Sequence, residues 1–323
     1  MILTLTPNPS IDLSLSLPVA LRPGGVQRLT SVAQSPGGKG INVAHACHSA
    51  GVDTLALFPA PSQGTFVRLM AETGVPYRII PGGVSVRTNT TVTEPDGTTT
   101  KLNGPGNPLS PSAVKAVEEA LIIAAGAAEW VVMSGSLPPG APHGWYQDLL
   151  ALVHDTFPDV PVAVDTSDGP LLELVDRIRD GAPAPTLIKP NGLELGQITG
   201  IDGASLERAA LDGDFSPAVD GARRILRHGV QRVLVTLGAA GAALVTDEGA
   251  WTTPAHPIRP ISTVGAGDCT LAGYLMADSR GAVPAVALAE AVALGAAAAS
   301  LPGTSIPRPG MVIPDSALVR KHH

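Results

Sequence analysis

Cysteine and aromatic residues are scarce in this chain. It has 323 residues, of which two are cysteines and 3% are aromatic. Cys47 and Cys269 lie in predicted helices and form neither a disulfide framework nor a metal-binding pattern, and the eight histidines are scattered. We therefore exclude a disulfide-stabilised secreted module and a zinc site, and we expect a reduced, cytoplasmic protein.

Clusters of positive charge and long apolar runs are also missing. The chain has 28 acidic against 21 basic residues, a formal net charge of −7, and no block of Lys and Arg. This balance argues against binding to nucleic acid or to an acidic membrane. The N-terminus MILTLTPNPSID lacks the features of a signal peptide, and no apolar stretch reaches membrane-spanning length. We expect no nucleic-acid or membrane partner, so local groups must hold any anionic ligand.

The residues that are present form a repeating pattern of helices and strands. Hydrophobic residues make up 44% of the chain, enough for a sizeable core. Helical stretches alternate with short apolar runs at 130–133, 160–164, 186–188, 232–235 and 242–245. Ser110 with Pro111 and Ser216 with Pro217 are typical helix starts. The alternation predicts an α/β fold with a mostly parallel central sheet flanked by helices.

Two polar, strand-like segments interrupt this pattern. Residues 12–17 alternate at period two, and residues 86–101 contain two Thr-rich strands joined by a turn. Together with residues 29–34 they predict a small, half-exposed antiparallel sheet. Either they are plain surface hairpins, or they form a lid over the ends of the parallel strands, where open α/β sheets bind ligands. We expect a single domain, 1–323, with a lid inserted as two segments, about 12–35 and 85–103.

The segment STVGAGDCTLAG from Ser262 combines a glycine turn, a helix start and a carboxylate. Gly265, Ala266 and Gly267 precede an apolar helix, whose N-terminus favours anions, and Asp268 follows them directly. This arrangement suits a carboxylate base that deprotonates a hydroxyl while backbone N–H groups hold a phosphoryl group. Helix-start chemistry alone produces the same pattern. The segment is neither a Walker A loop nor a GxGxxG fingerprint.

Several other segments could also bind a hydroxyl or a phosphate group. In PGGKGIN, Gly38, Lys39 and Asn42 combine a glycine turn with a cation and an amide. Asp12 could accept hydrogen bonds from sugar hydroxyls, and an Arg fork such as that of Arg87 matches a phosphate or a carboxylate. Each feature also has a purely structural interpretation. The segment PGGKGIN could be a plain turn, and Asp12 and Arg87 could be solvated side chains.

Three segments follow predicted strands and therefore belong at the edge where ligands bind. They contain Ser136, the pair Asn191 and Glu194, and the loop 236–241 with Thr236, Gly238 and Gly241. Asn191 and Glu194 could orient a hydrated Mg²⁺ or could simply form a capping box. The glycine loop would let a nucleotide approach the backbone, although it also suits any tight strand connection.

In this order, the segments resemble the PfkB, or ribokinase-like, carbohydrate kinases over nearly the whole chain. Two long signatures carry the resemblance, PGGKGINVAHACHSAG from Pro36 and STVGAGDCTLAGYL from Ser262. The segments TPNPSIDLSL, SGSLPPG and KPNGLE are similar to the phosphofructokinase and tagatose-phosphate kinase branch, and EPDGTTTKLNGPG to 1-phosphofructokinases. The resemblance implies a ribokinase-like fold with a small antiparallel β lid.

The resemblance also implies a role for each candidate residue. Asp268 would be the general base beside an anion hole of Gly265, Ala266 and Gly267, while Asp12, Gly38, Lys39, Asn42, Arg87 and Ser136 would bind the phosphosugar. ATP would lie along Asn191, Glu194, Thr236, Gly238 and Gly241, with Mg²⁺ organised indirectly by Asn191 and Glu194. A monovalent cation, often K⁺, would lie near Ser262, Val264, Ala298, Leu301 and Gly303.

The activity implied is transfer of a phosphoryl group from ATP to an alcohol group of a ketohexose phosphate. Fructose 1-phosphate, converted to fructose 1,6-bisphosphate, is the expected acceptor. Tagatose 6-phosphate and fructose 6-phosphate are alternatives, followed by a ribokinase-like sugar kinase and a non-catalytic sugar-phosphate-binding regulator. Members of this family commonly dimerise through their lids, so we expect a homodimer.

Two positions depart from the family pattern. Cys269 stands where this branch often has Ser, and Gly104 stands where Glu is common. Neither departure removes a catalytic group. Cys269 is either an oxidation-sensitive neighbour of the base or a small buried thiol.

Overall fold

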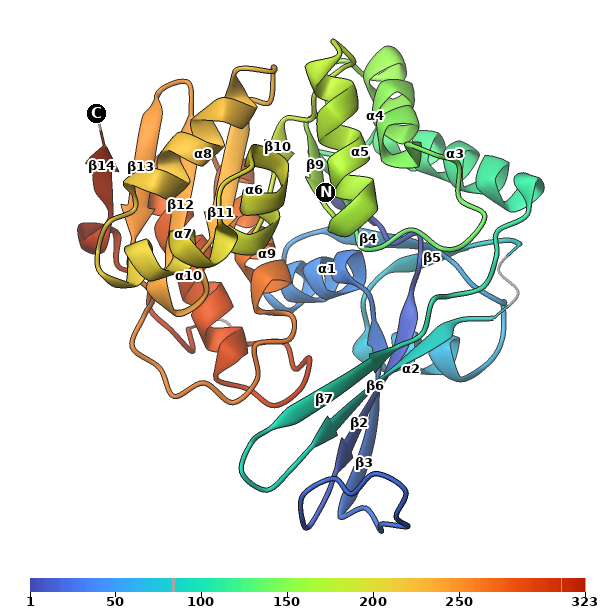
Figure 1. The fold of residues 1–323 in the computed structure, drawn as a ribbon. Coiled ribbons are helices and arrows are strands. Elements are labelled where there is room, and N and C mark those ends of the chain that lie inside the picture. Colours follow the sequence, from blue (N-terminus) through green and yellow to red (C-terminus); the bar gives the residue numbers. More distant parts are fainter. Residues whose placement is uncertain (83–84, 309, 323) are drawn as a thin grey trace.

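The fold centres on a large sheet whose strands are mostly parallel. We describe it from a computed structural model that covers residues 1–82, 85–308 and 310–322 (Figure 1). In this part of the chain ten strands are arranged in the order β14-β13-β12-β11-β10-β9-β8-β1-β4-β5. Neighbours from β11 to β5 pair in parallel, whereas β12, β13 and β14 form an antiparallel edge. The predicted α/β architecture is confirmed.

The strands of this sheet are short and mostly buried. Their bounds are β1 Ile2–Leu5, β4 Thr54–Pro59, β5 Tyr77–Ile80, β8 Trp130–Ser134, β9 Val162–Asp165, β10 Leu187–Ile188, β11 Arg232–Thr236, β12 Ala242–Thr246, β13 Gly249–Thr253 and β14 Arg320–His322. Each of the five apolar runs named from the sequence overlaps a strand of this sheet. The sequence interpretation did not name β1, β4, β5, β13 and β14 among its apolar runs.

Helices cover both faces of the large sheet. They are α1 Lys39–Ser49, α2 Thr65–Thr73, α3 Pro111–Ala125, α4 Trp145–Thr156, α5 Asp168–Arg179, α6 Gly192–Thr199, α7 Gly203–Leu211, α8 Ser216–Leu226, α9 Ala266–Ser279 and α10 Pro284–Ala299, with 3-10 turns η1 Gly238–Ala240 and η2 Ser316–Leu318. Side chains alternate along each strand, so Leu3 and Leu5 belong to the hydrophobic cluster that includes residues of α3 to α8, while Ile2 belongs to the cluster that includes residues of α1, α9 and α10. The two faces therefore have separate hydrophobic cores.

The two predicted helix starts differ in how they are capped. Ser110 accepts a hydrogen bond from the Ala113 amide at 3.2 Å and caps α3, as predicted. The same prediction for Ser216 is wrong, since α8 already includes this residue. The Asp214 carboxylate instead accepts from the Ser216 amide at 2.9 Å. The Asp two residues earlier competes for this role because its side chain bonds backbone amides nearby.

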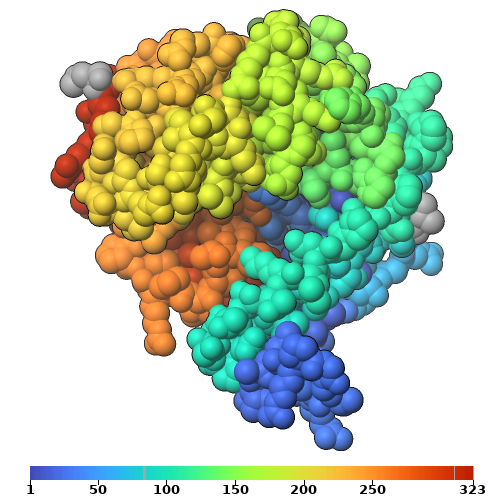
Figure 2. Space-filling model, viewed as in Figure 1, coloured from blue at the N-terminus to red at the C-terminus, as the bar shows by residue number. Residues whose placement is uncertain are grey.

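Four further strands form the second, smaller sheet, which we call the lid sheet. They are β2 Ser10–Ser16, β3 Ser31–Gly37, β6 Arg87–Thr93 and β7 Thr99–Asn103, in the order β3-β2-β6-β7. The predicted small sheet is thus present. Its hairpins β2-β3 and β6-β7 are antiparallel, whereas the central pair β2-β6 is parallel. Figures 1 and 2 show this sheet projecting from the body of the molecule.

Candidate active site

A cavity of about 1040 Å³ lies between the lid sheet and the body. Its wall includes residues from the carboxyl ends of β1, β8, β10 and β11, which is the edge where open α/β sheets bind ligands. Of the candidates named from the sequence, those lining it are Asp12, Gly38, Lys39, Asn42, Arg87, Ser136, Asn191, Thr236, Gly238, Gly241, Val264, Gly265, Ala266, Gly267 and Asp268. The structure therefore brings together segments from both ends of the chain.

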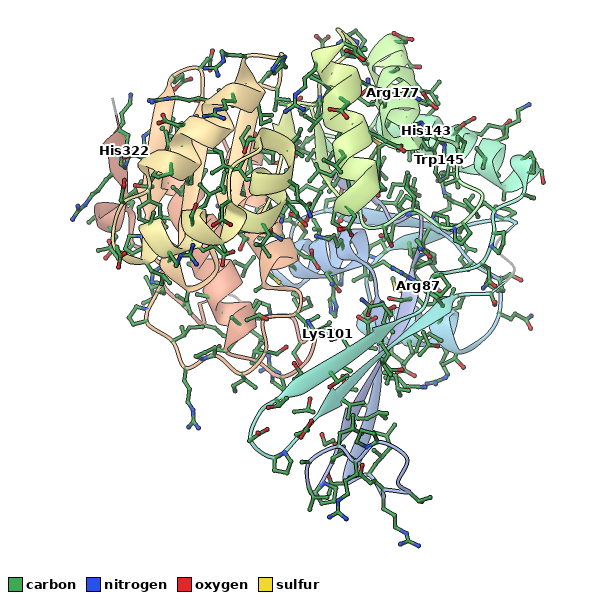
Figure 3. All side chains as sticks on the ribbon, in the orientation of Figure 1. Arg87, Lys101, His143, Trp145, Arg177 and His322 are labelled. Atoms are coloured by element: carbon green, nitrogen blue, oxygen red, sulfur yellow. The ribbon has the colours of Figure 1, made fainter. Side chains whose placement is uncertain are left out.

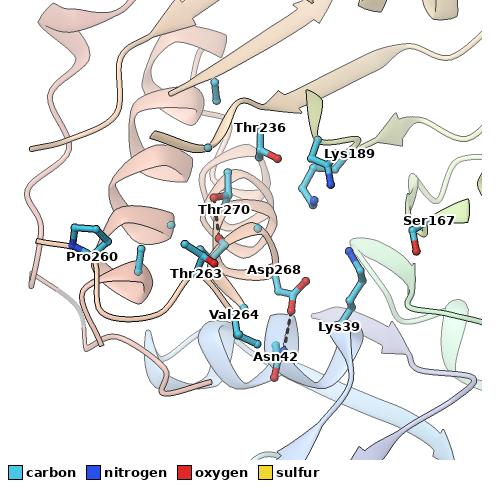
Figure 4. Close-up of a pocket in the computed structure, with 18 of the residues that line it drawn as sticks. Lys39, Asn42, Ser167, Lys189, Thr236, Pro260, Thr263, Val264, Asp268 and Thr270 are labelled. Carbon is cyan, nitrogen blue, oxygen red and sulfur yellow. Dashed lines mark hydrogen bonds between the residues drawn. The ribbon is translucent and has the colours of Figure 1, made fainter. Parts of the chain in front are cut away.

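The start of α9 places a carboxylate beside free backbone N–H groups. Gly265 precedes the helix with φ +78°, a left-handed conformation that favours glycine. In the described chain the Ala266 amide bonds Thr263 at 3.3 Å, while the Gly267 amide has no protein acceptor. Asp268, in the first turn, is 6% exposed and accepts a 2.7 Å hydrogen bond from Asn42 Nδ2 (Figure 4). An anion could accept a hydrogen bond from the Gly267 amide without displacing an existing one.

The Asp268 carboxyl group is adapted to accept a proton. Burial raises the pKa of Asp268, and the positive charge of Lys39 and the hydrogen bond from Asn42 oppose that rise. A carboxylate with a raised pKa is a stronger base than an exposed Asp, yet it stays ionised near neutral pH if its partners hold its charge. The amide of Asn42 also fixes one carboxylate oxygen, which leaves the other to meet a ligand.

The sequence interpretation missed a buried ion cluster beside this base. Asp165, the last residue of β9, is fully buried, and its Oδ1 accepts a 2.9 Å hydrogen bond from Lys39 Nζ. Lys189 Nζ, on a side chain that is 3% exposed, forms an ion pair with Oδ2 at 3.2 Å. Burial raises the pKa of Asp165, but Lys189 and Lys39 outweigh it and hold the pKa below its usual range. Asp165 was detectable only by its position directly after the predicted strand at 160–164.

These contacts orient two ammonium groups toward the cavity. Figure 4 shows Lys39 and Lys189 pointing into the space around Asp268. Burial lowers the pKa of Lys39, whereas Asp165 and Asp268 raise it, with a net upward shift. Lys39 therefore stays protonated at neutral pH. The cluster therefore supplies fixed positive charge beside Asp268.

Asp12 is the carboxylate that the lid sheet contributes. It accepts hydrogen bonds from Ser10 Oγ at 2.7 Å and from Asn89 Nδ2 at 3.3 Å. Burial raises the pKa of Asp12, and these two hydrogen bonds and the charges of Arg87 and Lys101 oppose the rise. A Cβ at Gly37 would lie 2.3 Å from the Asp12 Cγ, so only glycine leaves room for this carboxylate.

Arg87 is a half-buried cation that has no ion-pair partner within 4 Å in the described chain. Its Nη1 donates to the Gly104 carbonyl at 3.0 Å, and its buried Nε has no hydrogen-bond acceptor. Burial lowers the pKa of Arg87, which Asp12 opposes. A Cβ at Gly104 would lie 2.9 Å from the Thr88 carbonyl, which accounts for glycine at this departure from the family pattern. A guanidinium group that lines the cavity without an ion pair in the described chain is suited to bind an anion.

Ser136 lies near the Arg87 end of the cavity. Asn8 Nδ2 donates to Ser136 Oγ at 3.3 Å and to the Pro105 carbonyl at 3.1 Å. Asn8 therefore links the end of β1, the turn after β8 and the chain leaving the lid sheet. The sequence interpretation treated Asn8 only as part of a rigid Pro7-Asn8-Pro9 segment.

Asn191 and Glu194 form the capping box of α6. Asn191 Oδ1 accepts from the Glu194 amide and Glu194 Oε2 accepts from the Asn191 amide, both at 2.8 Å. Asn191 lines the cavity, whereas Glu194 is buried behind it. Burial raises the pKa of Glu194. The structure shows the capping alternative directly, and a role toward Mg²⁺ remains a prediction.

The loop 236–241 closes one wall with backbone rather than side chains. The Leu237 amide donates to the Gly241 carbonyl at 2.8 Å. Gly241 has φ +119°, and a Cβ there would lie 2.0 Å from the Thr253 carbonyl. The facing wall was not predicted and consists of Val292, Gly295, Ala296 and Ala299 of α10 with Ala255, His256, Pro257, Ile258 and Pro260. A slot lined mostly by apolar side chains and glycine suits a nucleotide base.

The five residues expected to hold a monovalent cation come from the loop before α9 and from the end of α10 with the loop that follows it, and these segments meet at Ala299. Its carbonyl accepts the amides of Ile261 at 2.8 Å and of Ser262 at 3.2 Å. The Ala298 carbonyl accepts the Leu301 amide at 3.0 Å and is therefore already engaged. Val264 lines the cavity, whereas Ser262, Ala298, Leu301 and Gly303 do not. The cation assignment stays a prediction.

Cys269 lies behind the base and away from solvent. Both Cys269 and Cys47 are buried and free. Burial raises the pKa of Cys269, and raises that of Cys47 to about 12. A protonated, inaccessible thiol is unreactive, so the geometry favours the structural interpretation of Cys269 over the oxidation-sensitive one.

No helix among the described residues is long and apolar enough to cross a membrane.

Comparison with known proteins identifies the family. Residues 6–310 match the model of the pfkB family carbohydrate kinases. The chain is 33% identical over 311 residues to ATP-dependent 6-phosphofructokinase isozyme 2 of Mycobacterium tuberculosis, covering 94% of this chain and 85% of that protein. It is also 33% identical over 309 residues to 1-phosphofructokinase of Haloferax volcanii, covering 95% and 93%.

Solved structures agree with this assignment. The crystal structure of phosphofructokinase-2 from Escherichia coli in complex with substrates and products matches with a TM-score of 0.82 and 28% identity, covering 96% of each chain. Ribokinase from Thermotoga maritima matches with a TM-score of 0.72 at 18% identity, covering 96% of this chain and 97% of that one, which shows the ribokinase-like fold alone. The chain therefore belongs to the pfkB family carbohydrate kinases, phosphotransferases with an alcohol group as acceptor.

Proposed function

We propose that this kinase phosphorylates a ketohexose phosphate with ATP, and that fructose 1-phosphate is the preferred acceptor, giving fructose 1,6-bisphosphate. The observation that carries the proposal is the half-buried Arg87, which has no ion pair within 4 Å in the described chain and lines the same cavity as Asp12 and Asp268. A phosphate on the sugar would supply the anion that Arg87 lacks. The similarity to enzymes named 1-phosphofructokinase and 6-phosphofructokinase supports a fructose phosphate as the acceptor.

The residues of the cavity would share the chemistry as follows. Asp12 and Asn42 would hold sugar hydroxyls, and Arg87 with Ser136 would hold the existing phosphate. Asp268 would accept the proton of the attacking hydroxyl, while the N–H groups at Gly265 to Gly267 would offset charge on the transferring group. Positioning and electrostatic stabilisation would supply most of the rate, as is usual for phosphoryl transfer.

The buried ion cluster would support this chemistry. Asp165 holds Lys39 at 2.9 Å and Lys189 at 3.2 Å, so both ammonium groups are oriented before any ligand binds. Two fixed cations near Asp268 would attract phosphate oxygens and stabilise the ionised base. Lys39 would face the phosphosugar, and Lys189, which directly precedes the capping box of α6, would face the nucleotide phosphates.

Asn191 and Glu194 fit a hydrated Mg²⁺, because amide and carboxylate oxygens are the donors that this ion prefers. Each residue has one oxygen committed to the capping box, and Glu194 keeps Oε1 free of it. When bound, Mg²⁺ would neutralise charge on the ATP phosphates. ATP itself would occupy the slot between loop 236–241 and α10. K⁺ near Ser262 and Val264 remains part of the proposal.

An assay of ADP release with five acceptors tests the substrate. Purified protein would be given fructose 1-phosphate, fructose 6-phosphate, tagatose 6-phosphate, fructose or ribose with Mg²⁺ and ATP. We expect the highest kcat/KM with fructose 1-phosphate. A higher value with either 6-phosphate would assign the kinase to that substrate, and activity only on fructose or ribose would contradict a phosphosugar. Binding of phosphosugars without turnover would favour a regulator.

Arg87→Ala should raise the KM for phosphosugars by about 10-fold or more, with a smaller effect on kcat, because a charge-assisted contact to the existing phosphate contributes about 1.5–3 kcal/mol. The KM for ATP and for unphosphorylated fructose should stay close to the wild-type value. Steady-state kinetics with each acceptor measures the change. Arg208→Ala, at an exposed ion pair with Asp202, is the control. An unchanged phosphosugar KM would contradict the role of Arg87.

We further propose a homodimer formed through the lid sheet and a cytoplasmic location. The sheet and its adjoining loop expose large apolar side chains, namely Val19, Leu21, Val26, Leu29, Val32 and Leu102. Exposed apolar patches of this kind support contact with a partner surface. Sedimentation equilibrium of the wild-type protein and of a Val32→Asp variant would test the dimer, which the variant should dissociate.

A further inference from the structure

The face of the lid sheet that carries Asp12 presents three rows of side chains across the strands. Directly paired residues lie on the same face, and residues two apart along a strand share that face. The rows are Gly37, Ser10 and Arg87, then Ser35, Asp12, Asn89 and Asn103, then Ala33, Ser14, Thr91 and Lys101. Arg87 and Lys101 therefore occupy the first and third rows, with Asp12 in the row between them.

The two outer rows face different parts of the body. The row of Arg87 lies at the Ser136 end, where Asn8 bonds Ser136 Oγ at 3.3 Å. In the middle row Ser35 Oγ lies 3.0 Å from Thr304 Oγ1, and in the third row Ser14 Oγ lies 3.6 Å from where a Cβ at Gly303 would stand. Gly303 and Thr304 belong to the loop that directly follows α10, the helix that lines the nucleotide slot.

Lys101 is in the same row as Ser14, on the opposite side of Asp12 from Arg87. Its side chain lines the cavity and is exposed, and no carboxylate of the described residues lies within 4 Å of its Nζ. Figure 3 shows Arg87 and Lys101 at separate places along the lid sheet, near its junction with the body. An unpaired lysine that faces a cavity has no structural partner to lose when a ligand binds. Its long, flexible side chain can adjust to the position of a bound phosphate.

We propose that Lys101 is a further catalytic residue, which binds the phosphoryl group in transfer while Arg87 binds the phosphate already on the sugar. The proposal rests on the proposed function. As the acceptor oxygen forms its bond to the γ-phosphorus, its proton passes to Asp268 and the bond from that phosphorus to the bridging oxygen of ADP breaks. Lys101 keeps its proton throughout and offsets the negative charge of the non-bridging oxygens.

Lys101→Met tests this role, because Met keeps the length of the side chain and removes its charge. We expect kcat to fall by about 10²-fold, the effect of removing one donor that acts on the transition state, with the phosphosugar KM changed by less than about threefold. Lys101→Arg should recover most of the activity. Lys115→Met on α3, an exposed lysine outside the cavity, is the matched control. Unfolding curves of all variants would exclude loss of the fold.

Two outcomes would overturn the proposal. If Lys101→Met raises the phosphosugar KM and leaves kcat normal, Lys101 binds the phosphate already on the sugar. If the kinetics of Lys101→Met are unchanged, Lys101 is only a solvated lysine. Failure of the proposed function gives a different result. If wild-type protein phosphorylates only fructose or ribose, the kcat comparison on that acceptor still decides the role of Lys101, since every acceptor receives the same phosphoryl group. If no acceptor is phosphorylated, both proposals are wrong.

Discussion

Asp268→Asn should lower kcat by about 10²–10⁴, the contribution of a positioned general base, while the KM values for ATP and the phosphosugar change by less than about threefold. The substitution removes the proton acceptor but keeps the shape of the side chain. The amide oxygen of the introduced asparagine can still accept the hydrogen bond that Asn42 donates at 2.7 Å in the wild type. Steady-state kinetics with saturating Mg²⁺ measures the loss.

Stability measurements separate a lost base from a lost fold. Burial raises the pKa of Asp268, so its ionisation opposes folding at neutral pH, and a neutral amide at this position should leave the free energy of unfolding unchanged or higher. Asp176→Asn, at an exposed ion pair with Arg179, is the control for kinetics. A variant at position 268 with near-normal kcat would remove Asp268 from the mechanism.

Asp165→Asn should lower the free energy of unfolding by about 3–5 kcal/mol, as expected when one partner of a buried ion pair is removed. The substitution leaves Lys189, which is 3% exposed, and Lys39 without their shared carboxylate. We also expect a large loss of kcat/KM, because both ammonium groups lose the contact that orients them. Urea denaturation at pH 7 measures the stability change.

The exposed pair between Asp148 and Arg177 provides the control. Asp148→Asn should cost no more than about 1 kcal/mol, since solvent screens a surface ion pair. An equally small effect at Asp165 would mean that the two lysines find other partners.

The effect at Asp165 should depend on pH in a defined direction. The pKa of Asp165 is lower in the folded protein than its ordinary value of 3.8. Its stabilising contribution is therefore fully present above pH 3.8 and is lost as the pH falls through the folded pKa. As the pH is lowered from 7 toward 3.8, the difference in unfolding free energy between wild type and Asp165→Asn should stay constant. Below pH 3.8 this difference should shrink.

Local sequence patterns predicted the parts of the site that lie within one segment. The turn at Gly265 and the carboxylate of Asp268 are three residues apart, so the positive φ and the helix start already place them together. The capping box of Asn191 and Glu194 spans four residues and was recognisable in the same way. The small sheet followed from the period-two and Thr-rich segments, which do not suit a sheet buried on both faces.

Contacts between distant segments could not be predicted from such patterns. Lys39 meets Asp165 across 126 residues, and Asn42 meets Asp268 across 226. Asp165 looked like any polar residue at a strand end, because its significance depends on two lysines that arrive from α1 and from the chain after β10. Likewise, the cavity wall from α10 reads in the sequence as an ordinary Ala-rich helix.

The sequence by itself determined the α/β class, the glycine turns and the presence of an acid, an arginine and an amide suited to a sugar kinase. The tertiary structure decided which charges are paired. It neutralised Asp165 with two lysines and left Arg87 and Lys101 without ion pairs within 4 Å among the described residues, on opposite sides of Asp12. The reason is physical: turn geometry depends on neighbours in the chain, whereas the energy of a charge depends on burial and on partners that only folding brings near.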